Sequence, residues 1–390
     1  MSVKSQVTNG DVKKIRILVI YDYFDPATLA GGPIVSCVNI IKYLNSDYEF
    51  FVYSSHRDLD GSILKVNEDQ WTDYQGIASV IYGKKLWSFK GYINVLKKIK
   101  PDIVYINGIY SLFAVVVPLL ISGWLRRSRN IVLAPRGMLQ KSSLNEKKYK
   151  KKLYLTFFLK LAGQCNLRWH VTGKEEEKDL KSFLRAAKSQ DILNVGNIPV
   201  TDMNFVEKPR NEQTLILLTV ALISPMKNIL PVLKALHRIK TNVIYNIYGN
   251  IKDIDYWERC LNEIKSLPEN IKVQYFGVAD RASIPKIMED HDYYIQPSKS
   301  ENFGHSIYEA LTTGLPVITS HKTPWNVQEK VAGWNVDGNS VEDISKAISF
   351  AADQNTMEYK KMARNAHQMA EDYLTDSALR QGYHELFAIT

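Results

Sequence analysis

The sequence predicts an α/β protein with two domains, each built on a parallel β-sheet covered by helices. The chain has 390 residues, which is too long for one ordinary hydrophobic core and fits two domains of about 180 to 200 residues each. Short apolar runs of strand length alternate with helical patterns, as they do in parallel sheets. The apolar content of 45% and the charged content of 23% are typical of a globular protein, so extensive disorder is not expected.

The first half of the chain begins with a strand, a loop and a helix. Residues 14–21 (KIRILVIY) form an apolar run, the turn-rich segment DYFDPATLAGGP follows, and a helical pattern covers residues 34–44. Further strands are predicted, with helical stretches between several of them, at residues 50–53, 79–82, 103–107, 131–134, 169–172 and 192–195.

A second alternating set follows a segment of weak periodicity. Residues 197–211 (NIPVTDMNFVEKPRN) contain two prolines and are predicted to link the domains. The strands predicted after this linker cover residues 215–221, 243–248, 273–276, 293–296, 316–319 and 334–336. An amphipathic helix is predicted near the C-terminus, at residues 373–387. In open parallel sheets ligands bind beyond the carboxyl ends of the strands, so two such domains would hold a substrate between them.

The cysteines and the apolar segments bear on the compartment. Cys37, Cys165 and Cys260 are widely separated and lack the spacing of metal ligands, which predicts reduced core thiols in a cytoplasmic protein. The first dozen residues lack the apolar centre of a signal peptide, so export is not expected. Residues 103–125 carry no charge, but proline, glycine and polar residues interrupt them. They are interpreted as a buried strand, a loop and an apolar helix, not as a membrane span.

The formal net charge of +9 is unevenly distributed. The segment that begins at Lys141 and ends at Lys160 holds seven lysines against the single Glu146 and becomes apolar and aromatic toward its end. This pattern fits a surface that docks on an anionic membrane, and equally a helix with a lysine-rich solvent face. Nucleic acid is a poorer candidate partner, because the aromatic residues do not alternate with the charges and no nucleic-acid motif is present.

Residues 301–320 (ENFGHSIYEALTTGLPVITS) are the most informative stretch for function. A predicted strand precedes them, and Phe303 and Gly304 form a loop that leads into a helix. Unpaired N–H groups and the positive end of the helix dipole make this helix start a seat for a phosphate or a sugar hydroxyl. Glu309 lies four residues after His305, so both face the same side, where a carboxylate would accept hydrogen bonds from a ribose.

This stretch resembles a known family. The positions that match the signature of family-4 retaining glycosyltransferases are Glu301, Phe303, Gly304, Glu309, Ala310, Gly314, Pro316 and Val317. The wider run SENFGHSIYEALTTGLPVITSHKTPW is similar to the subgroup that builds bacterial lipopolysaccharide, capsule and exopolysaccharide. The resemblance implies the GT-B fold, in which two Rossmann-like parallel-sheet domains face a central cleft and the C-terminal helix crosses back to the first domain. Residues 1–204, completed by 371–390, would bind the acceptor, and residues 205–370 the nucleotide-sugar donor.

The resemblance also implies which residues bind the donor. Gly31 and Gly32 match the glycine pair beside the donor diphosphate. Lys227 matches a lysine that neutralises this diphosphate together with an arginine, but Leu222 occupies the arginine position. Arg136, in a loop of the first domain, is the candidate for part of that missing work. Asn107 stands where many relatives have a histidine beside the donor sugar.

The signature loop supplies the remaining candidates. Asn302, Phe303, Gly304 and His305 are expected to contact the donor, and Glu309 its ribose. Glu301, which would hold the sugar hydroxyls, and Lys227, which would stabilise the leaving phosphate, are the candidate catalytic residues. Retaining enzymes of this fold are thought to use attack on the same face of the sugar, so no conventional nucleophile is required. Neither a metal ion nor a cofactor is expected besides the nucleotide sugar.

The sequence therefore predicts a metal-independent, retaining hexosyltransferase. Its expected partners are a nucleoside diphosphate sugar, a saccharide or lipid-linked saccharide acceptor, and an anionic membrane surface. The expected location is the cytoplasm, including a peripheral position on the inner face of the cytoplasmic membrane. A nucleotide-sugar epimerase of the same fold is one alternative, which the two signature carboxylates disfavour. A catalytically degenerate, basic membrane adaptor is the other, because the arginine is missing at Leu222.

Overall fold

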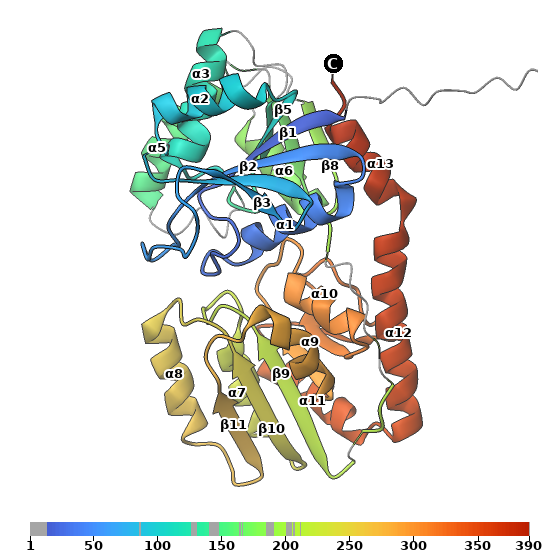
Figure 1. The fold of residues 1–390 in the computed structure, drawn as a ribbon. Helices are drawn as coiled ribbons and strands as arrows, with labels where there is room; N and C mark the ends of the chain where they lie inside the picture. Colours follow the sequence, from blue (N-terminus) through green and yellow to red (C-terminus); the bar gives the residue numbers. More distant parts are fainter. Residues whose placement is uncertain are drawn as a thin grey trace, which may run out of the picture.

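The described part of the chain forms two β-sheet domains stacked end to end (Figure 1). The protein is seen in a computed structural model that describes residues 14–85, 87–125, 131–139, 148–163, 165, 167–184, 191–199, 205, 207–210 and 212–389. The first sheet has eight strands and the second has six. Within the predicted linker, residues 197–211, positions 200–204, 206 and 211 lie outside the described residues.

The first sheet has the strand order β3-β4-β2-β1-β5-β6-β7-β8. Its strands are β1 (Ile15–Ile20), β2 (Tyr48–Ser55), β3 (Trp71–Tyr74), β4 (Ala78–Gly83), β5 (Ile103–Asn107), β6 (Ile131–Ala134), β7 (Leu167–Val171) and β8 (Asp191–Asn194). The pairing is parallel, as predicted, except at one edge. There the unpredicted strand β3 runs antiparallel to β4, with Trp71 opposite Ile81 and Tyr74 opposite Ala78.

Helices cover both faces of the first sheet. The elements are α1 (Gly32–Leu44), α2 (Phe89–Ile99), the π-helix η1 (Leu112–Val116), α3 (Val117–Leu125), α5 (Lys148–Ala162) and α6 (Lys174–Phe183). One hydrophobic cluster joins the sheet to α2, α3, α5 and α6, and a second joins its other face to α1. Burial on both faces explains why the central strands read as continuous apolar runs.

The second sheet is parallel, with the order β11-β10-β9-β12-β13-β14. Its strands are β9 (Thr214–Val220), β10 (Asn242–Tyr248), β11 (Ile271–Tyr275), β12 (Tyr293–Gln296), β13 (Val317–Ser320) and β14 (Gly333–Val336). The helical elements around it are α7 (Ile229–Leu236), α8 (Ile254–Ile264), the 3-10 helix η3 (Arg281–Ser283), α9 (Ile284–Glu289), α10 (His305–Thr312) and α11 (Val341–Asp353). Helices α7, α8 and α11 cover one face, and α10 packs on the other.

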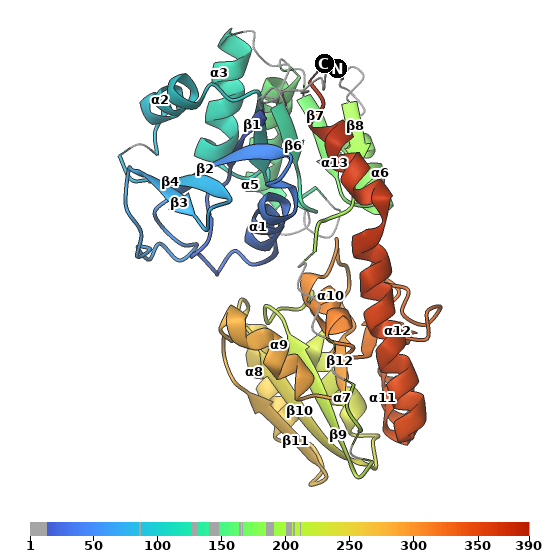
Figure 2. The ribbon, with the colours of Figure 1, turned by 45° about the vertical axis from the view of Figure 1, so that its right-hand side comes forward.

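The C-terminal segment crosses from the second domain back to the first (Figure 2). Helix α12 (Thr356–Thr375) packs on α10 through Ala366 and Ala370. Helix α13 (Ser377–Leu386) then adds Leu379 and Tyr383 to the core beneath α1. The predicted crossing is confirmed, but it consists of two helices, because Asp376 leaves the helical conformation and caps the start of α13.

The long uncharged segment packs partly into the core of the first domain, and the three cysteines lie in hydrophobic clusters of the two domains. Residues 103–125 divide into β5, η1 and α3, of which β5 is completely buried. Across the described ranges, we find no helix that combines the length and the hydrophobicity needed to span a bilayer. Cys37, Cys165 and Cys260 are free thiols and are buried.

Candidate functional site

The signature loop joins the carboxyl end of β12 to the start of α10. Gly304 is the residue before the helix and has φ of 79°, a left-handed conformation that a side chain would strain. A Cβ atom at Gly304 would also lie 3.0 Å from Cδ1 of Ile307. The glycine therefore sets the sharp entry into α10, a helix that lies at the end of the second domain facing the first domain (Figure 1).

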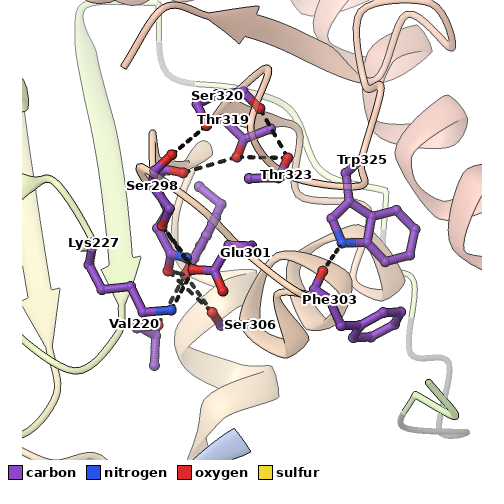
Figure 3. Close-up of polar contacts among 12 residues, drawn as sticks. Val220, Lys227, Ser298, Glu301, Phe303, Ser306, Thr319, Ser320, Thr323 and Trp325 are labelled. Carbon is purple, nitrogen blue, oxygen red and sulfur yellow. Dashed lines mark hydrogen bonds and ion pairs between the residues drawn. The ribbon is translucent and has the colours of Figure 1, made fainter. Parts of the chain in front are cut away.

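Glu301 and Lys227 form an ion pair, although 74 residues separate them in the sequence (Figure 3). Oε1 of Glu301 accepts a hydrogen bond from Nζ of Lys227. The same oxygen accepts hydrogen bonds from Nε2 of Gln296 at 2.9 Å and from Oγ of Ser298 at 2.8 Å. The Glu301 side chain is only 11% exposed. Among the described residues, its second oxygen, Oε2, has no hydrogen-bond donor, so this oxygen is available to a ligand.

A buried asparagine holds the loop that carries Lys227. Asn228 has φ of 65° and directly precedes α7. Its side-chain amide is buried and donates to the carbonyl oxygens of Pro297, at 3.0 Å, and Gly338. These bonds tie the lysine loop to the segment that follows β12. The ammonium of Lys227 thus stands opposite Glu301 because two chain segments are fixed to each other.

Two residues of the signature loop contact the first domain. Nδ2 of Asn302 donates to Oγ1 of Thr172 at 2.6 Å and to Oε2 of Glu176 at 3.2 Å. Nε2 of His305 lies 3.0 Å from Oγ of Ser36, in α1. Burial, and then the charge of Arg136, lower the pKa of His305 to about 3, so its ring is neutral near pH 7. Predicted as donor contacts, Asn302 and His305 also bridge the two domains.

The glycine pair of the first domain lies against the second domain. Gly31 has φ of 64°, and a Cβ atom on it would lie 3.6 Å from Cδ1 of Leu222. A Cβ atom on Gly32 would lie 3.8 Å from Cδ2 of His305. The structure therefore brings Gly31 and Gly32 together with the signature loop and with the leucine that replaces the arginine of the resembling family.

Arg136 and Asn107 belong to one network beneath these glycines. The guanidinium donates to Oδ1 of Asn107 at 2.7 Å, to the hydroxyl of Tyr105 at 2.6 Å, and to Oδ1 of Asn197. Asn107 is 1% exposed, and its Nδ2 donates to the carbonyl oxygen of Pro33 at 3.1 Å. Three of the five N–H groups of Arg136 are thus used within the first domain. Both Oδ1 and Nδ2 of Asn107 are therefore hydrogen-bonded to other groups of the protein.

Among the carboxyl groups described at this site, Glu309 has the largest shift in pKa. It lies one turn beyond His305 in α10 and is partly exposed. Burial raises its pKa to about 7, against a lowering effect from the charge of Arg281. Among the described residues, no donor hydrogen-bonds to its carboxylate. An acidic group that lacks a protein partner and faces the domain interface suits hydrogen bonds from hydroxyl groups.

Phe303 lies in the core and not at an open surface. It is 5% exposed, and its ring contacts those of Trp325 at 5.1 Å and Tyr373 at 5.5 Å between centroids. Its carbonyl oxygen accepts a hydrogen bond from the indole N–H of Trp325 (Figure 3). The side chain of Phe303 therefore anchors the loop to α12, so any contact with a donor would come from its backbone.

At three helices that begin beside this site, the residue before the helix makes no capping hydrogen bond through its side chain. They are α1, α7 and α10, preceded by Gly31, Asn228 and Gly304. In contrast, α2, α8, α11, α12 and α13 each begin with a side chain that accepts a backbone N–H. In α1, Pro33 has no N–H and the N–H of Ile34 donates to the carbonyl oxygen of Gly31 at 3.0 Å. In α7, Pro231 has no N–H and the N–H of Leu230 donates to the hydroxyl of Tyr256 at 2.8 Å. Of these three helices, α10 is therefore the one whose first-turn N–H groups are most available for an anion. In the part of the chain that is described, no group of three or more His, Cys, Asp or Glu residues could hold a metal ion.

Comparison with solved structures identifies this architecture. A sucrose-phosphate synthase from Thermosynechococcus elongatus superposes with a TM-score of 0.72 at 18% identity, over 97% of this chain and 100% of that one. Anabaena Alr3699/HepE, solved in complex with UDP and glucose, superposes with a TM-score of 0.67 at 17% identity, over 95% and 99%. The fold is GT-B. The predicted fold class is confirmed.

Sequence comparison finds a family model similar to the second domain. Residues 200–369 match the family model of group 1 glycosyl transferases. The GtfA subunit of a UDP-N-acetylglucosamine–peptide N-acetylglucosaminyltransferase from Streptococcus pneumoniae is 25% identical over 226 residues, which are 54% of this chain and 42% of that protein. The chain thus spans less than half the length of this relative. Together, the family model and the GT-B neighbours support a glycosyltransferase.

Three features of this GT-B site were not predicted. Thr172 and Glu176 receive Asn302 from the other domain. Asp22, directly after β1, accepts a hydrogen bond from Oγ of Ser111 at 2.8 Å, and burial raises its pKa to about 6. Arg281 acts electrostatically on Glu309 and His305. Asp22 and Thr172 carried a sequence signal, because polar residues just after a parallel strand lie at the ligand-binding edge of the sheet.

Proposed function

We propose that the chain is a retaining, metal-independent glycosyltransferase that moves a hexosyl residue from a nucleoside diphosphate sugar to a saccharide acceptor. The observation that carries the proposal is the Lys227–Glu301 ion pair, which leaves Oε2 of Glu301 open close to the uncapped start of α10. In this proposal residues 205–370 bind the donor, and residues 1–204 with 371–390 bind the acceptor.

The proposed chemistry is substitution at the anomeric carbon of the sugar. The bond from this carbon to the diphosphate oxygen breaks, the acceptor oxygen bonds to the same face, and the departing phosphate oxygen takes the acceptor proton. Negative charge grows on the phosphate, where Lys227 and the first-turn N–H groups of α10 stabilise it. Glu301 orients hydroxyls of the sugar, and Glu309 accepts hydrogen bonds from the ribose.

The donor-binding assignment is tested by nucleotide binding and turnover. The purified chain is expected to be stabilised against thermal unfolding by one of UDP, GDP or dTDP, because ligand that binds only the folded state raises its stability. With the matching nucleotide sugar and a membrane lipid extract it is expected to release nucleotide in the presence of EDTA. Proton NMR of the product would show the anomeric configuration of the donor retained.

The alternatives predict other outcomes of the same assay. Release of a changed nucleotide sugar without an acceptor would indicate an epimerase. Silence with every donor, together with binding to lipid, would indicate an adaptor. Inversion of the anomeric configuration would contradict the proposed same-face attack.

A pocket in the first domain suits the acceptor. Its volume is about 510 Å³, within the range of ligand sites, and its lining includes Asp25, Lys65, Asn67, Asp73 and Tyr74. The hydroxyl of Tyr74 donates to Oδ2 of Asp25 at 2.9 Å. Carboxylates, an amide and an aromatic ring match the hydroxyls and the apolar face of a saccharide. The pocket shares the β1–α1 loop with Gly31 and Gly32, so an acceptor bound there would extend toward the donor site.

The proposed role is the extension of a lipid-linked saccharide in surface polysaccharide synthesis, on the inner face of the cytoplasmic membrane. Helices at one end of the first domain support a membrane contact. Large apolar side chains are exposed on α2, η1, α3 and α5, namely Phe89, Leu112, Phe113, Leu120 and Phe157. These elements pack against one another through the pairs α2–α3, η1–α3 and α3–α5. Exposed lysines stand on α2 and α5, namely Lys90, Lys97, Lys98 and Lys160, so the surface fits anionic lipid. The first part of the predicted lysine-rich segment, residues 141–147, lies outside the described residues.

Replacing both Phe113 and Phe157 by serine is expected to reduce binding to vesicles several-fold, because each substitution removes an exposed apolar side chain from the lipid contact. The measurement is cosedimentation with vesicles of phosphatidylglycerol and phosphatidylcholine. Phe350→Ser, at an exposed phenylalanine of the second domain, is the control and should bind like the wild type. Equal binding by the double variant, or equal binding to pure phosphatidylcholine, would contradict the membrane assignment.

A further inference from the structure

The site lacks one positive charge that a diphosphate needs. The resemblance described above places an arginine at position 222, where this chain has Leu222. The leucine side chain lies against Gly31 of the first domain, an apolar contact that contributes no charge. This matters if the donor is a nucleoside diphosphate sugar, so the inference below rests on the proposed function.

The other cations already assigned to the site are engaged by protein groups. The ammonium of Lys227 is paired with the carboxylate of Glu301, so the net charge of this pair is near zero. The guanidinium of Arg136 donates to oxygens of Asn107, Tyr105 and Asn197. A diphosphate carries about two negative charges near neutral pH, comparable with other phosphate groups. A further cation is therefore required where the nucleoside diphosphate would lie.

Arg281 stands at the required place. It is the first residue of η3, which continues into α9, and α9 packs on α10 through the cluster that joins Ile284 and Ile287 to Ile307. Figure 2 shows α9 beside α10, at the end of the second domain that faces the first. The Arg281 side chain is exposed, and among the described residues no hydrogen bond or ion pair engages its guanidinium.

The charge of Arg281 reaches groups on both sides of the domain interface. It acts on Glu309 and His305 in α10, lowering the pKa of each, and on Tyr74 in β3 of the first domain. These groups belong to both domains, in agreement with the position of η3 and α9 at the end of the second domain that faces the first (Figure 2). The Arg281 guanidinium therefore lies near the domain interface, within electrostatic reach of Glu309. In a nucleoside diphosphate the phosphate is attached to the ribose that Glu309 is proposed to bind. A cation near Glu309 is therefore placed for the phosphate.

We propose that Arg281 is the second cation for the donor diphosphate and replaces the charge that is absent at Leu222. A guanidinium presents a planar fork of N–H donors that bonds two phosphate oxygens at once, which a lysine cannot do. Lys227 then stabilises the phosphate next to the sugar, and Arg281 the phosphate next to the ribose. The pair of cations is restored from a different element of the same domain.

The experiment compares Arg281→Leu with the wild type by isothermal titration calorimetry. The ligand is whichever of UDP, GDP and dTDP stabilises the wild type most. Affinity for this nucleotide is expected to fall about 10- to 100-fold, since one charge-assisted contact is lost. Affinity for the corresponding nucleoside, which has no phosphate, should stay unchanged. Arg259→Leu, at an exposed arginine of α8, is the matched control and should bind like the wild type.

A second substitution tests the exchange of positions directly. Adding Leu222→Arg to Arg281→Leu is expected to recover affinity for the diphosphate, because the charge returns to the position used in the resembling family. A double variant as weak as Arg281→Leu would contradict the idea that both positions serve one group. Unchanged binding by Arg281→Leu, or an equal loss for the nucleoside, would overturn the role of Arg281 alone. Failure of the wild type to bind any of the three nucleotides would overturn the proposed function itself, and Arg281's role with it.

Discussion

Replacing Lys227 by alanine is expected to lower the turnover of the nucleotide sugar by about 100- to 1,000-fold, the effect of removing one preorganised group that stabilises charge in a transition state. The ammonium is held opposite Glu301 by the Asn228 loop, so it needs no reorganisation when the phosphate departs. The loss should appear mainly in kcat, because the charge on the leaving phosphate is greatest in the transition state.

The control for Lys227→Ala is Lys234→Ala, which removes the same charge. Lys234 is exposed and lies within α7, whereas Lys227 lies in the loop before that helix. Lys234→Ala should keep wild-type kcat. Thermal unfolding of both variants separates catalysis from folding, because Lys227→Ala also leaves the largely buried Glu301 without its cation. A folded Lys227→Ala variant with nearly normal kcat would remove Lys227 from the proposed chemistry.

Replacing Glu309 by glutamine is expected to make the free protein more stable at high pH. Burial raises the pKa of Glu309 from 4.5 to about 7, so the folded state disfavours the ionised form. The penalty is absent below pH 4.5, grows between pH 4.5 and 7, and is complete above pH 7. We expect the free energy of unfolding of Glu309→Gln to exceed that of the wild type by about 2 kcal/mol at pH 8, and by nothing at pH 4.5.

The same substitution is expected to weaken nucleotide binding. Ribose hydroxyls donate to a carboxylate more strongly than to an amide, so wild-type affinity should increase between pH 6 and 8 as Glu309 ionises, and the variant should lack this dependence. Denaturant titrations and calorimetry across this pH range are the measurements. Glu258→Gln, at an exposed glutamate of α8, should change neither property. Stability or affinity that follows pH identically in Glu309→Gln and the wild type would exclude Glu309 from the site.

Most of the fold could be predicted from the sequence, because buried parallel strands leave strong local patterns. The predicted bounds of β5, β6 and β12 agree with the structure to the residue. Strand β3 was missed because its four residues, WTDY, lack both alternation and a continuous apolar run. It exists because β4 offers an edge for antiparallel pairing. The sequence predicted one C-terminal helix at residues 373–387, whereas the structure has two, α12 and α13, the first of which begins at residue 356. The prediction missed the break because one aspartate, Asp376, is enough to end α12 and begin α13.

The candidate site was only partly predictable. The signature identified Glu301 and Lys227, but their ion pair depends on Asn228 joining two distant loops. The sequence around Arg281 contains no motif, so it does not indicate that this arginine lies near the candidate site. Its place near Glu309 results from the packing of α9 on α10, and the partners of Asn302 lie in another domain altogether.

The bridge from Asn302 to Thr172 and from His305 to Ser36 has a thermodynamic consequence. The five residues from Glu301 to His305 both carry the proposed sugar contact and fasten one lobe to the other. A ligand that moves residues 301–305 therefore changes the free energy of contact between the two domains. By thermodynamic linkage, separating the domains changes the affinity for that ligand by the same factor. Ligand binding at this loop and the separation of the two domains are therefore thermodynamically coupled.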